Sequence, residues 1–305
     1  MRIGVLFPQF EIGADPVSVR DFAQAAEELG YTHLTAFDQI VGLNKASRPD
    51  WRYVHDAEDM FHELFVLFGY LAALTERIEL VTGVLVLPMR GTALVAKQAA
   101  EVDLLSRGRL RLGVGVGVKP EEFLACGEAF RNRGARTDEQ IEVLRKLWTS
   151  DLITFEGRYH QIEDGGINPL PIQRPVPIWI GGISEAAMRR VARLGDGWIP
   201  NFDADDFGRE CIERMHGFAR AQGRDPATIG IEATVTIIDR TPEQLADELR
   251  RWQDLGASHA TLNTMPERWV ASEGRWNKAA MRGLPDPQAH IDAIRRFHDV
   301  LPELF

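Results

Sequence analysis

The stretch Val84–Gly117, VLVLPMRGTALVAKQAAEVDLLSRGRLRLGVGVG, contains the strongest fold signal in the chain. Val84–Leu87 and Leu110–Val116 are apolar runs of strand length, and apolar residues recur between them near helical spacing. A strand, a helix and a second strand joined by short turns form a βαβ unit, which requires parallel strands. The second strand ends in alternating glycines, from Gly113 to Gly117. We expect these glycines to leave one face bare, so that a flat ligand can lie against the backbone.

Strand and helix patterns alternate along the rest of the chain. Strands are expected at residues 2–7, 33–37, 78–87, 110–116, 176–180, 197–200, 229–238 and 259–262, and helices at 17–29, 61–74, 93–105, 137–148, 184–194, 205–222, 242–255 and 286–300. Thr137 with Gln140, and Thr241 with Gln244, have the spacing of capping boxes at helix starts. About eight alternations are typical of a (β/α)8 barrel. A doubly wound open sheet is the alternative, but it rarely needs so many alternations.

Four segments are longer than ordinary loops and show little periodicity: Ile40–Glu58, Val118–Arg133, Asp151–Pro175 and Met265–Pro285. Long loops in a compact domain often form lids or binding loops. All of them except Asp151–Pro175 follow a strand, so in a barrel they are expected to meet at one mouth.

The composition excludes several classes of function. A net charge of −10 argues against nucleic acid and anionic membrane surfaces as partners. No apolar run approaches the roughly 20 residues of a membrane span. The sequence starts directly with the strand Arg2–Phe7, so we expect no signal peptide and a cytoplasmic protein. Cys126 and Cys211 lie outside any CxxC pattern, and we interpret them as structural thiols in a reducing cytosol.

Two strand ends carry candidate chemistry. Gly181 and Gly182 end a buried strand and Ser184 caps the next helix, so the free N–H groups there can bind a phosphate. A plain strand-turn-helix junction is the alternative. Asp38 ends the second strand, at the catalytic mouth of a barrel, and is followed by Gln39. The Asp38 carboxylate can accept a proton or a ligand hydrogen bond, or it can cap a helix or pair with an arginine.

Gly83 and the tryptophans allow two interpretations each. A glycine inside a strand marks a bulge or a close backbone approach, or it simply eases packing. Trp51, Trp269 and Trp276 lie in expected loops and can line an apolar pocket. The other tryptophans are expected in the core: Trp148, Trp179, Trp198 and Trp252.

Familiar hydrolytic and metal motifs are missing. The stretch HELFV at His62 lacks the second histidine of HExxH, because Val66 stands there. His55 and His62 can in principle share a metal, but we interpret them as scattered surface histidines and expect no metal site. No GxSxG elbow supports serine hydrolysis.

Six stretches together carry a resemblance to a known family. They are, in chain order, AEELGYTHLTAFD, LAALTERIELVTGVLVLPMR, AKQAAEVDLLSRGRLRLGVGVG, RGARTDEQIEVLRKLW, PVPIWIGG and GDGWIP. From Arg2 to about Pro200 the chain resembles the luciferase-like monooxygenase superfamily, bacterial-luciferase-type barrels that use flavin or deazaflavin. Within it, the chain looks most like oxidoreductases that depend on the deazaflavin coenzyme F420. The resemblance implies one (β/α)8 TIM-barrel domain over residues 1–305, with long strand-to-helix loops.

The resemblance also implies a role for each candidate position. In deazaflavin relatives a non-prolyl cis peptide bond after the third strand lies against the ring, and the matching bond here is Gly83–Val84. Val116 and Gly117 would contact the ring or its side chain. Asp38 matches an acidic residue near the ring, and we expect it to be catalytic. The implied cofactor-binding residues are Asp38, Gly83, Val84, Val116, Gly117, Gly181, Gly182, Ile183 and Ser184, of which the last four would hold the phosphate.

Two positions depart from the family pattern. Relatives often carry histidine where this chain has Gln39, and glutamine cannot shuttle protons, so an acid–base role there is lost or has moved. The sugar-phosphate dehydrogenase relatives carry glutamate where Val118 stands. We therefore expect a less polar substrate, in a pocket formed by Gln39, Trp51, Trp269 and Trp276.

Three functional hypotheses follow from the resemblance. The first is an oxidoreductase that transfers a hydride between coenzyme F420 and a small, fairly apolar organic substrate. The second is a two-component monooxygenase that takes reduced FMN from a partner reductase. The third is a protein that binds a flavin or deazaflavin without turnover. Relatives often dimerise, so a homodimer is one expected assembly.

Overall fold

The computed structural model describes residues 1–51, 53, 55–265, 269–272, 275–278, 283–284 and 286–302. In this part of the chain, eight parallel strands close into a barrel in the order β3-β2-β1-β11-β10-β9-β8-β5, and β3 pairs with β5 to complete the ring. The strands are β1 (Arg2–Leu6), β2 (His33–Ala36), β3 (Glu79–Thr82), β5 (Leu110–Gly115), β8 (Ile178–Gly181), β9 (Gly197–Ile199), β10 (Gly230–Thr236) and β11 (His259–Asn263). The predicted (β/α)8 barrel is confirmed.

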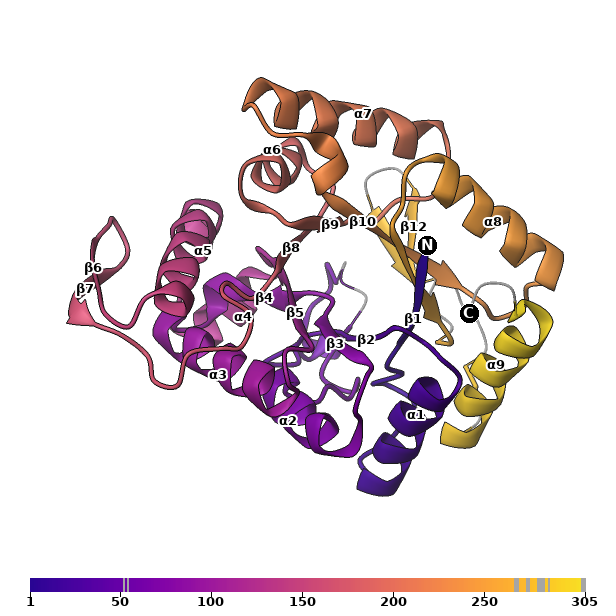
Figure 1. Cartoon of the computed structure of the whole chain (residues 1–305). Helices are drawn as coiled ribbons and strands as arrows, with labels where there is room; N and C mark the ends of the chain where they lie inside the picture. Colours follow the sequence, from indigo (N-terminus) through magenta and orange to yellow (C-terminus); the bar gives the residue numbers. More distant parts are fainter. Residues whose placement is uncertain are drawn as a thin grey trace.

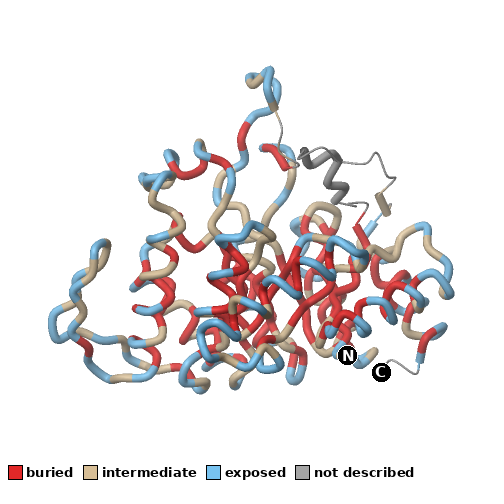
Figure 2. Tube along the Cα trace, turned by 90° about the horizontal axis from the view of Figure 1, so that it is seen from above, coloured by how far each residue is buried: buried red, intermediate tan, exposed pale blue. Residues whose placement is uncertain are grey.

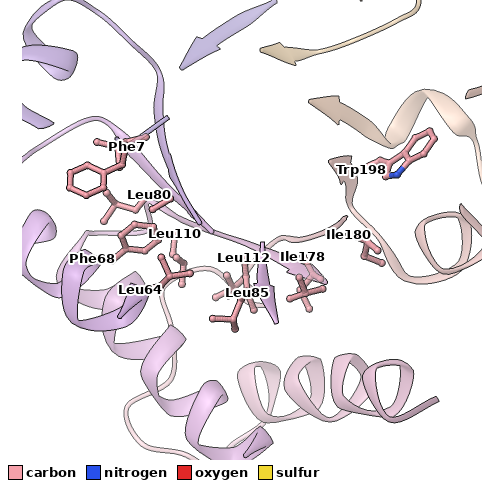
Figure 3. Packing of buried hydrophobic residues seen from close by; sticks show 14 of the residues in the cluster. Phe7, Leu64, Phe68, Leu80, Leu85, Leu110, Leu112, Ile178, Ile180 and Trp198 are labelled. Atoms are coloured by element: carbon pink, nitrogen blue, oxygen red, sulfur yellow. The ribbon is translucent and has the colours of Figure 1, made fainter. Parts of the chain in front are cut away.

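Helices surround this barrel (Figure 1). They are α1 (Pro16–Glu28), α2 (Leu64–Leu74), α3 (Thr92–Leu105), α5 (Arg133–Thr149), α6 (Glu185–Leu194), α7 (Asp206–Ala221), α8 (Pro242–Asp254) and α9 (Pro287–Val300). Between the strands and these helices lies a continuous apolar core, in which Leu110, Leu112 and Ile178 point away from the barrel axis toward the helices (Figure 3). Trp148, Trp198 and Trp252 are fully buried, and Trp179 is nearly so, as the sequence predicts.

Alternate residues of each strand face the barrel interior. Several of these inward-facing residues are charged, so the interior is not purely apolar. Arg111 and Glu232 are 2% and 1% exposed and form an ion pair. Arg111 Nε also donates to Glu79 Oε2 at 3.1 Å, and His33 Nε2 lies 3.2 Å from Glu232 Oε1. Burial opposes ionisation of Glu232, but the charges of Arg111 and His33 hold its pKa well below the usual range. The network joins β2, β3, β5 and β10 across the barrel.

Two expected elements differ from those observed. The strand expected at 78–87 is interrupted at Gly83–Val84, which separates β3 from β4 (Leu85–Val86). The capping box at Thr137 is wrong, because α5 already begins at Arg133 and Thr137 Oγ1 donates to the Arg133 carbonyl at 2.8 Å within the helix. The capping box at Thr241 is confirmed.

The expected loops contain secondary structure: the segment Ile40–Glu58 has a 3₁₀ turn at Lys45–Ser47, and the other three have a helix or strands. The segment after β5 contains the short helix α4 (Pro120–Ala125). In the segment after α5, β6 (Ile153–Glu156) and β7 (Gln161–Gly165) form an antiparallel hairpin that projects beyond α5 (Figure 1). β12 (Trp269–Ser272) and β13 (Arg275–Lys278) pair antiparallel in the segment expected to be a loop from Met265.

Described parts of the chain rise above the end of the barrel opposite to the N-terminus (Figure 2). This end is where parallel strands have their carboxyl ends, the usual position of barrel active sites. None of the described helices has both the length and the apolarity needed to cross a membrane.

Candidate active site

Adjacent strands bring the predicted cofactor-binding segments side by side. β4 lies next to β5, with Val86 opposite Gly115, and β5 lies next to β8, with Val114 opposite Ile180. Gly83–Val84 lies between β3 and β4, Val116–Gly117 follows β5, and Gly181–Ser184 begins at the last residue of β8. All of these residues are half-buried except Ser184, which is exposed. The Gly83–Val84 peptide bond is cis, as the resemblance implies.

Val84 occupies the space that the glycines leave open. A Cβ atom at Gly115 would lie 2.6 Å from Val84 Cγ2, and one at Gly181 would lie 2.8 Å from Val84 Cγ1. At Gly117 it would lie 2.6 Å from Val86 Cγ1. The expectation of a bare glycine face is therefore wrong, because the chain's own valines cover it. Because Gly115 and Gly181 have no side chains, Val84 packs directly against the backbone of β5 and β8. Its side chain, which is only half-buried, forms an apolar surface at the mouth, called here the Val84 platform.

The start of α6 has the geometry of an anion site. Ser184 is the N-cap and its Oγ accepts the Ala187 N–H at 3.2 Å. Gly182 has a φ of +108°, which favours glycine, and its carbonyl accepts the Trp198 indole N–H at 2.7 Å. The first N–H groups of a helix have no intrahelical acceptor. Glu185 lies in this turn, but two arginines of α6 and α7 bind its carboxylate. These residues fit a phosphate.

Asp38 has an arginine partner. Its side chain is 1% exposed, and Arg90 Nη1 and Nη2 donate to the two carboxylate oxygens, each at 2.7 Å. The Val86 N–H donates to the same carboxylate at 2.8 Å. Asp38 thus fixes the backbone of β4 just after Val84. A catalytic role for Asp38 stays a prediction, and the observed contacts favour a role in positioning.

Gln39 joins two loops of the mouth. Its Nε2 donates to the Asp56 carbonyl at 3.2 Å, and its Oε1 accepts from Lys119 Nζ at 3.1 Å. Lys119 also donates to the His55 carbonyl at 3.2 Å and to Glu122 Oε1 at 3.1 Å. The segments Ile40–Glu58 and Val118–Arg133 therefore meet, as predicted. Lys119 and Glu122 were not among the residues predicted from the sequence, although charged residues directly after the glycine-rich strand are a signal for them.

Aromatic rings line the same region. The ring of Phe10 lies 4.4 Å from that of His55, 4.9 Å from that of Phe61 and 6.4 Å from that of Phe37. His55 is buried among them, so its interpretation as a surface histidine is wrong. Its ring has this position because the loop after β2 folds back onto Phe10.

The remaining predicted residues have varied placements. Trp51 is half-buried and packs edge-on against Tyr53 at 5.2 Å. The side chains of Trp269 and Trp276 lie outside the described residues. Cys126 and Cys211 are both free thiols. Among the described residues, no group of three His, Cys, Asp or Glu side chains is placed to hold a metal.

These features define a class of protein: a parallel (β/α)8 barrel whose mouth has an apolar surface at Val84 and, at the start of α6, a helix N-terminus with the geometry of an anion site. Residues 1–301 match the family model of luciferase-like monooxygenases. The chain belongs to this family.

The proteins similar to this chain in sequence include both uncharacterised proteins and enzymes with a named activity. An uncharacterised protein of Mycobacterium tuberculosis is 40% identical over 243 residues, 77% of this chain and 81% of the relative. An F420-dependent glucose-6-phosphate dehydrogenase of Kineococcus radiotolerans is 29% identical over 306 residues, 91% of this chain and 85% of that protein. The fold is shared with an F420-dependent secondary alcohol dehydrogenase solved with an F420–acetone adduct, with a TM-score of 0.77, 18% identity and coverage of 100% and 99%.

Proposed function

We propose that this protein is an oxidoreductase that transfers a hydride between coenzyme F420 and a small, fairly apolar organic substrate. The observation that carries this proposal is the Val84 platform, which lies beside the helix start at Ser184. A flat ring with a phosphate-bearing side chain needs both features, at neighbouring strand ends. The relatedness to an F420-dependent dehydrogenase supports the same cofactor.

The bound deazaflavin would supply the carbon that gives or accepts the hydride. Val84 would support one face of the ring, and Gly181 to Ser184 would hold the phosphate through backbone N–H groups. Asp38 and Arg90 would keep the backbone after Val84 in place, so that ring and substrate are aligned. The aromatic rings around Phe10 would exclude water and favour an apolar substrate.

A monooxygenase that uses FMN is the second candidate. It is favoured by the description of the family as luciferase-like monooxygenases. In that case the same platform and helix start would bind reduced FMN, and a partner reductase would supply it.

Equilibrium binding distinguishes these candidates. Purified apo-protein is titrated with F420 and with FMN, each oxidised and reduced, and binding is followed by ligand fluorescence. Ser184→Ala, which removes the capping oxygen, serves as the site variant. Tight binding of F420 alone supports hydride transfer, and preference for reduced FMN supports the monooxygenase. If neither binds, both candidates are wrong.

A further inference from the structure

We propose that Lys119 and Glu122 together hold the proton of this active site, in the role that Gln39 cannot perform. The inference rests on the proposed hydride transfer, because such a transfer to a carbonyl also requires a proton. Glutamine has no titratable group, so another residue near Gln39 has to carry the proton. Lys119, which contacts the Gln39 side chain directly, and Glu122, which contacts Lys119, are titratable residues at this position.

The contacts of Lys119 fix the arrangement. Its ammonium group has three N–H donors, and three acceptors lie within 3.2 Å: Gln39 Oε1, the His55 carbonyl and Glu122 Oε1. Lys119 is 8% exposed and Glu122 is 6% exposed. An ammonium group can only donate, so the amide oxygen of Gln39 has to face Lys119. The pair is therefore enclosed between the loop after β2 and α4.

Burial is the main influence on the ionisation of Glu122. Burial raises the pKa of Glu122, and the carboxylates of Asp38 and Glu121 raise it further, while Lys119 acts in the opposite direction. Arg90 and Cys126 lie in the same neighbourhood, since the charges of Arg90, Glu122 and Asp38 all act on the pKa of the Cys126 thiol. Buried carboxyl groups with a raised pKa occur often at functional sites.

The proton follows the hydride in a balanced step. When a carbonyl carbon of the substrate receives a hydride from reduced deazaflavin, a C–H bond forms and the C=O π pair moves to oxygen. The oxygen takes a proton from Lys119 Nζ, replacing Gln39 as its acceptor. The neutral Glu122 returns a proton to the amine and becomes a carboxylate. The substrate would gain a hydride, with its two electrons, from the deazaflavin and a proton that Glu122 finally gives up, so that hydrogens and electrons balance. Lys119 is then a catalytic residue, and Glu122 is a positioning residue that sets its charge state.

Two variants with a matched control test this role in the loaded enzyme. Glu122→Gln keeps size and a hydrogen bond but cannot release a proton, and Lys119→Arg keeps the charge but does not release a proton. Glu142 and Lys146 form an exposed pair on α5 at 3.9 Å, so Glu142→Gln and Lys146→Arg are the controls. We expect Lys119→Arg to lower kcat by about 10²- to 10⁴-fold with an unchanged Kd for the cofactor. The fall of wild-type carbonyl reduction at high pH is expected to disappear in Glu122→Gln.

Unfolding of the apo-protein gives a second readout that needs no cofactor. An acid whose pKa is raised by folding stabilises the folded state below the unfolded pKa of about 4.5, and this contribution is lost as pH rises through the folded pKa. Urea unfolding therefore compares the folding equilibrium constant of the wild type with that of Glu122→Gln at several pH values. The wild-type constant, relative to that of the variant, should fall by up to tenfold for each pH unit above about pH 4.5 until the folded pKa is passed. Glu142→Gln should show no such trend.

The outcomes separate this inference from the function on which it rests. If the wild type binds F420 but Glu122→Gln keeps the wild-type pH profile and the same unfolding trend, the proton role is overturned and the proposed function stands. If the wild type binds neither F420 nor FMN, the proposed function fails and this inference fails with it. If Glu122→Gln does not fold, Lys119→Arg still decides: an unchanged kcat refutes the proton role.

Discussion

Replacement of Gly115 by alanine tests the platform on which the proposed function depends. The added Cβ would lie 2.6 Å from Val84 Cγ2, whereas carbon atoms in contact are normally about 3.5–4.0 Å apart. A shift of about 1 Å is therefore needed. Gly115 lies on β5 and its backbone has no positive φ, so the steric contact with Val84 is the main effect.

The expected cost follows from overpacking. Extra methyl groups in a packed region cost about 1–3 kcal/mol. If the whole of this cost weakens F420 binding, the Kd for F420 rises by about 5- to 150-fold. The assay is a fluorescence titration with F420, together with urea unfolding. Gly217→Ala on α7 is the control, because a Cβ there meets nothing within 4 Å.

A double variant shows whether Val84 transmits the effect. Val84→Ala removes both Cγ atoms, so Gly115→Ala should cost much less in the Val84→Ala background than in the wild type. The reasoning is refuted if Gly115→Ala binds F420 with the wild-type Kd and unfolds at the same urea concentration. It is also refuted if the double variant loses as much as the sum of the single variants.

Three further predictions concern the interior network and the helix start. Arg111→Met leaves Glu232 buried without its arginine partner and should lower the free energy of unfolding by about 3–5 kcal/mol in urea. Adding Glu232→Gln should recover part of this loss. Burial, with the charge of Arg111, lowers the pKa of His259 to about 3, so stability should be full above about pH 6.5 and fall as the pH drops toward 3. His259→Gln should flatten this acid limb, and an unchanged limb would contradict the assignment. Ser184→Ala should weaken the helix start by about 1 kcal/mol and raise the Kd for F420, measured by fluorescence.

Much of the fold could be predicted from the sequence. The alternation of strands and helices depends on local periodicity and capping residues such as Asp15, Ser184 and Thr241, and each of these caps its helix as a local pattern predicts. Thr137 failed as a cap because the adjacent 3₁₀ turn continues directly into α5, and Gln140 instead donates to the Leu87 and Arg90 carbonyls. That contact joins residues far apart in the chain, so no local pattern reveals it.

The part of the candidate site that lies within a single strand–helix junction could be predicted from the sequence. The glycines at 181 and 182 and the cap at Ser184 form a site within one strand-helix junction. The expectation for Gly115 failed because the atom that fills its bare face, Val84 Cγ2, comes from the preceding strand segment. The pairing of Asp38 with Arg90 was one of several alternatives, and only the contact of the segment after β2 with β4 and the turn that follows it decided between them.

The sequence by itself determined the alternation of elements, the barrel and the strand ends that carry glycine and Asp38, because these depend on neighbours within a few residues. The tertiary structure decided which side chains meet: Arg111 with Glu232 inside the barrel, Val84 over the glycines, and Lys119 with Gln39 and Glu122 at the mouth. Closure of the ring places residues as far apart as His33 and Thr261, 228 positions from each other, within hydrogen-bonding distance. Burial and charge at those meeting points, and not local sequence, set the ionisation of the site.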